Sequence, residues 1–188
     1  MKTSLCLAVL LIPSAALAFE SSDTIPQDQR MRFHNPDGSC VQCSLGMLGV
    51  DANVPAAEML LWQSAYGPAE RGGSTPTRVA RYCQSRNIPI LNITGRDTLA
   101  YIDAALDSGR CVGITWGSAH FIIAVSRDQA AYYVCDNRYP ERIDRVDAAT
   151  FQRNVRAYST AGWCVVLKGP KPLPWKAPPV VAWWDNLP

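Results

Sequence analysis

The chain has 188 residues, of which 48% are hydrophobic, and its 18 basic and 16 acidic residues give a net charge of +2 at pH 7. The charges are scattered along the sequence rather than gathered in a basic block, which argues against nucleic-acid binding. This length and hydrophobic content suit one compact domain with its own core.

The N-terminal segment, residues 1–18, has the pattern of a secretory signal peptide. Lys2 precedes an apolar stretch over residues 5–17, and the segment ends in the small-x-small sequence Ala16-Leu17-Ala18. The stretch is too short for a stable membrane span, so we expect cleavage after Ala18 and a secreted or periplasmic protein. No later segment is apolar over enough residues to cross a bilayer, which predicts no stable membrane insertion.

Helices are predicted in the first part of the remaining chain. Residues 19–34 are polar without a clear period and predict an extended lead-in. After the turn residues 35–38, a helix is expected over residues 39–48, with Ser39 or Asp37 as its N-cap. Three more helices are expected. The first follows Asn53 and has Met59, Leu60 and Trp62 on its buried side, the second starts at Thr75, and the third runs from Asp97 to Gly109. A strand over residues 88–93 is expected before the third helix.

Strands are predicted in the second part. Short apolar runs rich in β-branched and aromatic residues predict strands over residues 111–116, 120–126, 131–135 and 163–167. Residues 127–130 are expected to join the second and third of these into a hairpin. Asp147 predicts the start of a short helix that continues through Val155. Helices followed by an antiparallel sheet give an α+β fold.

The tail of the chain has an unusual composition. Residues 169–188 contain six prolines and three tryptophans, which predicts an extended arm rather than a helix. The predicted organisation is therefore a signal peptide (1–18), a lead-in (19–34), one folded domain (35–168) and a Pro/Trp-rich C-terminal arm (169–188). No feature of the sequence indicates an oligomeric state.

Seven cysteines are present, and Cys6 lies in the expected signal peptide. The other six are Cys40, Cys43, Cys83, Cys111, Cys135 and Cys164. In an oxidising compartment these are expected to form disulfides, unless one is a catalytic thiol, in which case at least one more must be unpaired or bonded outside the chain. The Cys40-x-x-Cys43 pair lacks two further ligands at matching spacing, so neither a zinc site nor another cofactor is expected.

One ordered set of residues points to chemistry. Cys40 opens a predicted helix, His120 opens a predicted strand, and Asp136 and Asn137 follow the next strand. A thiol attacks as the thiolate, which a helix N-terminus and an imidazolium both favour. His120 would act as base and then acid, with a third polar group fixing its orientation, so the order predicts Cys40 as a nucleophile. Gln42, which the helical period turns away from this site, is predicted to lie at the surface.

The hairpin register leaves two candidates for the third group. If residues 127–130 form the loop, the strands pair so that His120 lies opposite Asn137. A loop one residue longer places Asp136 there instead. Because register follows from loop length, both residues remain candidates.

This arrangement resembles the papain-like cysteine peptidases, and in layout it is most similar to the bacteriocin-leader-processing (double-glycine peptidase) type. The similarity is carried by the segments His120–Val125, Tyr132–Asn137 and Asp147–Phe151 before a closing strand. Asp37-Gly38-Ser39-Cys40 also resembles the Asp-Gly-x-Cys signature of ovarian-tumour-type deubiquitinases, which share the papain-like order. The resemblance implies N-terminal helices packed on a C-terminal antiparallel sheet, and an exported hydrolase that acts on a peptide or protein substrate.

Two roles depart from the family's pattern. The oxyanion-hole glutamine of the family lies at the position that His34 occupies here, so the resemblance makes the neighbouring Asn35 a candidate donor. Aligned with the Gly-Ser-Cys-x-x-Cys run of papain, Cys43 would be the nucleophile and Cys40 would form a disulfide, with Cys83 as one partner. We prefer Cys40 because the preceding turn places it at the start of the helix, whereas Cys43 falls one turn inside.

A second function fits the same residues. If both Cys40 and Cys43 form disulfides, the chain is a non-catalytic, disulfide-stabilised binding or structural domain on a papain-like scaffold. The state of these thiols discriminates between the two functions, because an enzyme of this kind must keep one of them free.

Overall fold

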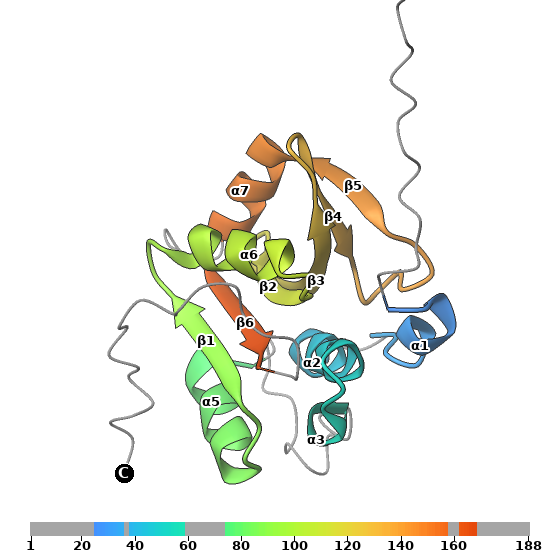
Figure 1. Ribbon diagram of the computed structural model, residues 1–188, viewed down its shortest axis with the longest axis vertical. Helices are drawn as coiled ribbons and strands as arrows, with labels where there is room; N and C mark the ends of the chain where they lie inside the picture. The colour runs from blue at the N-terminus through green and yellow to red at the C-terminus, as the bar shows by residue number, and fades with distance from the viewer. Residues whose placement is uncertain (1–24, 36–37, 59–73, 158–161, 169–188) are drawn as a thin grey trace, which may run out of the picture.

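Figure 1 shows a computed structural model of the protein, in which residues 25–35, 38–58, 74–157 and 162–168 are described. The helices are α1 (Gln27–Met31), α2 (Cys40–Asp51), α3 (Pro55–Glu58), α5 (Pro76–Ser85), α6 (Thr98–Asp107) and α7 (Ala148–Arg156). The strands are β1 (Ile90–Thr94), β2 (Val112–Trp116), β3 (His120–Arg127), β4 (Ala131–Cys135), β5 (Asp144–Asp147) and β6 (Trp163–Leu167). They form one six-stranded sheet in the order β1-β6-β2-β3-β4-β5, with every neighbouring pair antiparallel. The predicted α+β class is confirmed.

The sheet lies between two groups of helices, with α2 on one side and α6 and α7 on the other (Figure 1). The side chains of successive residues of β3 point to opposite faces of the sheet. Phe121 and Ile123 belong to the core that contains α2, whereas Ile122 and Ala124 belong to the core that contains α6 and α7. A strand covered on both faces is apolar without interruption, which explains the continuous hydrophobic run after His120.

Helix α2 is the central helix of one of these layers. Residues 40–49 are all buried, and the helix packs against β2, β3, β6 and α3. Gln42 is 1% exposed, so its predicted surface position is wrong, because α2 is covered on every side rather than on one face. In the described structure neither amide atom of Gln42 has a hydrogen-bond partner.

A short helix, α1, occupies part of the segment that was predicted to be extended. The buried Arg30 side chain donates to the backbone oxygens of Ile25 at 2.6 Å and Pro140 at 2.8 Å. These contacts are the physical reason for the difference. A single helical turn is too short to be stable alone, so α1 depends on its contact with Pro140. Because Pro140 is distant in the sequence, the local pattern of residues 19–34 does not indicate this helix.

Strand β5, which consists mostly of charged residues, lies at the edge of the sheet and was not predicted from the sequence. Its residues Asp144-Arg145-Val146-Asp147 pair with β4 and alternate between half-buried and exposed positions. Charged side chains are common on edge strands, where they discourage pairing with other chains. The predicted cap at Asp147 is confirmed, since its side chain accepts the N–H of Thr150 at 2.9 Å at the start of α7.

Several predictions concern residues outside the described ranges. These are the signal peptide (1–18), the buried side chains of Met59, Leu60 and Trp62, and the C-terminal arm (169–188). Among the helices of the described residues, none combines the length and the apolar character needed to cross a membrane.

No disulfide joins the six cysteines of the described residues. Cys40, Cys43, Cys83, Cys111, Cys135 and Cys164 are each buried and unbridged. The expected disulfides, including one between Cys40 and Cys83, are therefore absent from this part of the chain. Burial within the two apolar layers accounts for these cysteines without cross-links, because a free cysteine packs as a small hydrophobic residue.

Gly113 on β2 allows the core to close around α2. A Cβ at this position would lie 2.7 Å from Cε1 of Phe121 and 3.2 Å from Cδ1 of Leu48. The Phe121 ring is itself held against Trp163, with ring centroids 4.4 Å apart. The missing side chain at position 113 therefore makes room for a packed aromatic pair.

We predict that Gly113→Ala destabilises the fold by about 1–3 kcal/mol, because the added methyl group overpacks a filled core. Urea denaturation of the two proteins measures the difference. A variant with an unchanged unfolding midpoint would show that the Phe121 ring can move away at no cost.

Candidate active site

Cys40 is the first residue of α2. The chain enters the helix through Gly38, which has a φ of 96° and donates its N–H to Oδ1 of Asn35 at 3.0 Å. Only glycine adopts this backbone conformation readily, so the turn is encoded by Gly38. Ser39 occupies the N-cap position, but its side chain makes no capping hydrogen bond. The first-turn N–H groups beside Cys40 therefore have no side-chain cap from Ser39.

His120 lies between Cys40 and an acid. It is the first residue of β3, where it pairs with Trp116 of β2, and its side chain is 15% exposed. Its Nε2 lies 2.8 Å from Oδ1 of Asp136, and the Cys40 side chain lies near enough to raise the pKa of the ring. The structure thus brings together Cys40, His120 and Asp136, with the imidazole in the middle.

The contact between His120 and Asp136 favours the charged form of both side chains. Burial lowers the pKa of His120, but its hydrogen bonds with Asp136 and Cys40 outweigh burial and raise the pKa from 6.5 to about 8. Burial likewise raises the pKa of Asp136, but hydrogen bonds from His120 and Arg138 hold it well below its usual range. At neutral pH the site therefore contains an imidazolium beside a carboxylate.

The loop of the β3–β4 hairpin is shorter than expected. Oδ1 of Asp128 accepts the N–H groups of Ala130 and Ala131 at 2.7 and 2.8 Å, which tightens the turn. Arg127 belongs to β3 and pairs with Tyr132, so the loop between the strands is residues 128–130 and the predicted loop of residues 127–130 is one residue too long. An aspartate side chain that bonds to the backbone two and three residues further on is a common device for such a turn.

A bulge then shifts the register again. The pairing changes between Ala124 and Ser126, and beyond this point Ile123 lies opposite Cys135, the last residue of β4. Continued past the strand end, this register places neither Asp136 nor Asn137 directly opposite His120, so both predicted pairings are wrong. The chain instead turns at Asp136, whose backbone oxygen accepts the N–H of Tyr139 at 2.9 Å. The turn brings the Asp136 carboxylate to His120.

Asn137 has a different place in the site. Its side chain is wholly buried, and its Nδ2 lies 3.0 Å from the Cys40 backbone oxygen, 2.9 Å from Ser44 Oγ and 2.8 Å from the Phe121 backbone oxygen. Its Oδ1 accepts from Asn35 Nδ2 at 3.0 Å, and its backbone oxygen accepts from the Asn35 N–H at 2.8 Å. Asn137 therefore joins α2, β3 and the loop before α2, and it makes no hydrogen bond with His120.

The two remaining candidates lie beside the site but are engaged elsewhere. The Asn35 amide is buried, with its oxygen bound to the Gly38 N–H and its nitrogen bound to Asn137. The Cys43 thiol lies 3.8 Å from the backbone oxygen of His34. Cys40 is among the groups that raise the pKa of His120 and Cys43 is not, which favours Cys40 over Cys43 as the thiol paired with the imidazole.

Three of the other buried thiols have an environment that opposes ionisation. Burial raises the pKa of Cys83 to about 12 and the pKa of Cys135 to about 11. Burial also raises the pKa of Cys164. These three cysteines are protonated at neutral pH, so they are poor nucleophiles there.

Arg138 is the site residue that the sequence analysis did not single out. Its guanidinium contacts both oxygens of Asp136, with Nη2 2.6 Å from Oδ2. The signal available in the sequence was an arginine two residues after a candidate acid. No group of three or more metal-ligating side chains occurs among the residues that the structure describes.

The chain matches no family model and no curated protein. Among solved structures it is similar to a double glycine motif protease from an AMS/PCAT transporter, crystallised in complex with the leader peptide. The TM-score is 0.52 at 18% sequence identity, and the match covers 72% of this chain and 89% of that chain. The two proteins share a fold. The predicted resemblance is thereby supported at the level of the α+β architecture.

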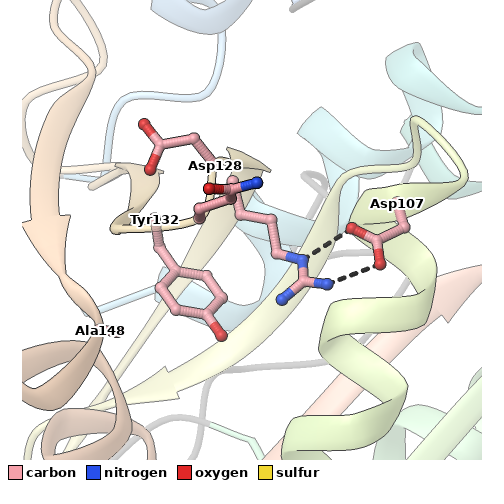
Figure 2. Close-up of a pocket in the computed structure, with 6 residues that line it drawn as sticks. Asp107, Asp128, Tyr132 and Ala148 are labelled. Atoms are coloured by element: carbon pink, nitrogen blue, oxygen red, sulfur yellow. Dashed lines mark hydrogen bonds and ion pairs between the residues drawn. The ribbon is translucent and has the colours of Figure 1, made fainter.

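A separate pocket of about 420 Å³ lies on the α6 and α7 side of the sheet. It is lined by Asp107, Arg127, Asp128, Gln129, Tyr132 and Ala148 (Figure 2). Arg127 donates two hydrogen bonds to Asp107, at 2.7 and 2.6 Å, and these pull its guanidinium toward α6. The pocket contains none of the residues of the candidate active site, which belongs to the α2 side.

We predict that Asn137→Ala lowers the free energy of unfolding by roughly 2–4 kcal/mol, because it removes a buried donor from several acceptors at once. Asn137→Asp retains the shape but replaces the donor with an oxygen, so it should be at least as destabilising. Urea denaturation of the three proteins measures both effects. A loss below about 0.5 kcal/mol in either variant would contradict a structural role for this amide.

We predict that His120 titrates with a midpoint of about 8 and that Asp136→Asn lowers this midpoint, because the carboxylate favours the imidazolium. Since the pKa is raised on folding, this interaction stabilises the fold fully below pH 6.5 and its contribution is lost as the pH rises through about 8. NMR titration of the histidine ring protons measures the midpoint. A His34→Gln background leaves a single histidine signal, since the chain has two histidines.

Proposed function

We propose that the protein is an exported cysteine hydrolase of the papain-like type, with Cys40 as nucleophile, His120 as general acid and base, and Asp136 as the group that orients His120. The observation that carries the proposal is the position of His120, which lies 2.8 Å from Asp136 and near enough to Cys40 for that side chain to raise its pKa. A nucleophile, a base and an orienting acid in contact are the requirements of covalent catalysis by such a triad.

In the first step the Cys40 thiolate attacks the carbonyl carbon of a peptide bond, and the carbonyl oxygen becomes an oxyanion. The C–N bond then breaks as the His120 imidazolium gives its proton to the leaving amine. This step yields a free amine, a thioester on Cys40 and a neutral imidazole.

In the second step water attacks the thioester carbonyl while neutral His120 takes a proton from the water. The C–S bond breaks, the carboxylic acid product leaves, and the Cys40 thiolate and His120 imidazolium are restored. The raised pKa of His120 suits both steps, because a group with a pKa near the working pH can give and take a proton.

The oxyanion requires hydrogen-bond donors near Cys40. The backbone N–H groups of the first turn of α2 fill this role in the proposal, since they lie at a helix N-terminus and Ser39 does not cap them. Asn35 is a weaker candidate than its sequence position indicates, because its amide is bonded to Gly38 and Asn137.

The proposed substrate is a peptide or an unfolded protein segment. The solved structure with the same fold is a protease in complex with a leader peptide, which supports a peptide ligand for this chain as well. Export is proposed from the sequence of residues 1–18. The alternative, a disulfide-stabilised domain without activity, has less support because neither Cys40 nor Cys43 forms a disulfide in the described structure.

We predict that iodoacetamide at neutral pH alkylates Cys40 before any other cysteine of the folded chain, because Cys40 is the thiol paired with an imidazolium. His120→Ala should slow this labelling roughly 10-fold or more, whereas Cys43→Ser should leave it unchanged. Mass spectrometry of tryptic peptides identifies the labelled site. Preferential labelling of Cys43 would overturn the assignment of the nucleophile, and labelling of neither residue would overturn the catalytic proposal.

Hydrolysis itself is tested with a mixture of unstructured peptides analysed by mass spectrometry. The native chain should cleave some of them, and Cys40→Ala should cleave none. If the native chain labels at Cys40 but cleaves no peptide, the thiolate is present and the peptidase function is wrong.

A further inference from the structure

The Asp136 carboxylate is held from two directions. Its Oδ1 accepts from His120 Nε2 at 2.8 Å, from the Arg138 backbone N–H at 2.9 Å and from Arg138 Nε at 3.1 Å. Its Oδ2 accepts from Arg138 Nη2 at 2.6 Å and from Nε at 3.2 Å. Within the described residues, Arg138 is the only residue that donates to Oδ2.

We propose that Arg138 is a positioning residue of this site, which clamps both oxygens of Asp136 so that one of them faces His120. The inference rests on the proposed function, because it concerns the same three residues. Arg138 does not contact the reacting atoms in this proposal; it acts through Asp136.

The geometry explains why a clamp is needed. Asp136 follows the last residue of β4, so no strand pairing fixes its backbone beyond Cys135. A carboxylate at such a position can rotate about its side-chain bonds and turn its oxygens away from the imidazole. The guanidinium is a rigid planar fork, and two contacts to two oxygens fix the plane of the carboxylate as well as its position.

Arg138 also has an electrostatic effect that opposes its geometric one. The groups that face His120 in the described structure are Cys40 from α2 and Asp136 after β4, with Arg138 behind the latter and Trp116 beside it on β2. As a nearby cation, Arg138 disfavours the imidazolium; as a clamp, it favours the imidazolium by keeping the carboxylate in contact. The two effects of removing Arg138 on the pKa of His120 have opposite signs, and an experiment can therefore separate them.

The chain provides a matched control in Arg142. Its Nε lies 3.2 Å from Oδ1 of Asp144, two residues later in the chain, whereas Asp136 comes two residues before Arg138; its side chain is 58% exposed against 52% for Arg138. Both guanidinium groups also lie over the ring of Tyr139, at 4.8 Å for Arg142 and 5.8 Å for Arg138. Arg142 thus has the same charge, a similar exposure and a similar ion pair, but its acid is not the one bound to His120.

The test compares Arg138→Gln, Arg138→Lys and Arg142→Gln in the full chain. The first readout is the NMR titration of His120, which requires no substrate. We expect Arg138→Gln to lower the midpoint from about 8 and Arg142→Gln to leave it unchanged. A midpoint that stays the same or rises in Arg138→Gln overturns the proposal, because the clamp then adds nothing beyond the charge of the arginine.

The second readout is the rate at which iodoacetamide alkylates Cys40 at pH 7. Arg138→Gln should slow it on the order of 10-fold, as expected when a catalytic group is misplaced, with Arg142→Gln unchanged. Arg138→Lys retains the charge but offers one nitrogen instead of a fork, so its midpoint and rate should lie between those of the native chain and Arg138→Gln. If Arg138→Gln fails to fold, the Arg138→Lys variant alone tests the proposal. A native midpoint and rate in Arg138→Lys overturn the two-point clamp.

These readouts separate the inference from the proposed function. If the native chain cleaves peptides but the titration midpoint of His120 is the same in Arg138→Gln as in the native chain, the inference about Arg138 fails and the proposed function stands. If the midpoint falls as expected but no peptide is cleaved, Arg138 positions Asp136 and the peptidase function is wrong.

Discussion

The buried side chain of Asn137 is the contact on which the position of the candidate site depends. Its amide ties the start of α2 to β3 and to the loop before α2, through hydrogen bonds that are all inside the protein. A buried amide whose partners are all present specifies one arrangement, because losing any of them in a low-dielectric interior is costly. Cys40 lies on α2 and His120 on β3, so this single side chain sets their separation while touching neither the thiol nor the imidazole.

The buried thiols of the described residues differ in their neighbours. Cys83, Cys135 and Cys164 lie in apolar surroundings that raise their pKa values, which makes them part of the core rather than of any chemistry. Cys40 is also buried, but it is the thiol that raises the pKa of His120. The distinction comes from one charged neighbour and not from exposure.

The fold class, the strands around His120 and the start of α2 could be predicted from the sequence, because apolar runs and turn residues encode them locally. The choice between Asp136 and Asn137 could not, since it depends on a tight turn at Asp128 and on a bulge shortly before it, and each changes the register. The burial of Gln42 and the helix around Arg30 were missed for a related reason. Both are determined by segments that are distant in sequence, which a local pattern does not contain.

Asp136, Asn137 and Arg138 are consecutive in the chain, and each lies in a different environment. The first contacts the imidazole, the second fills the interior, and the third faces solvent. Inserting or deleting one residue between the end of β4 and Arg138 would exchange these environments and put a charge where the amide is buried. Length variation among natural variants is therefore expected at the hairpin tip around Gln129, where the chain is exposed, and not in this short segment.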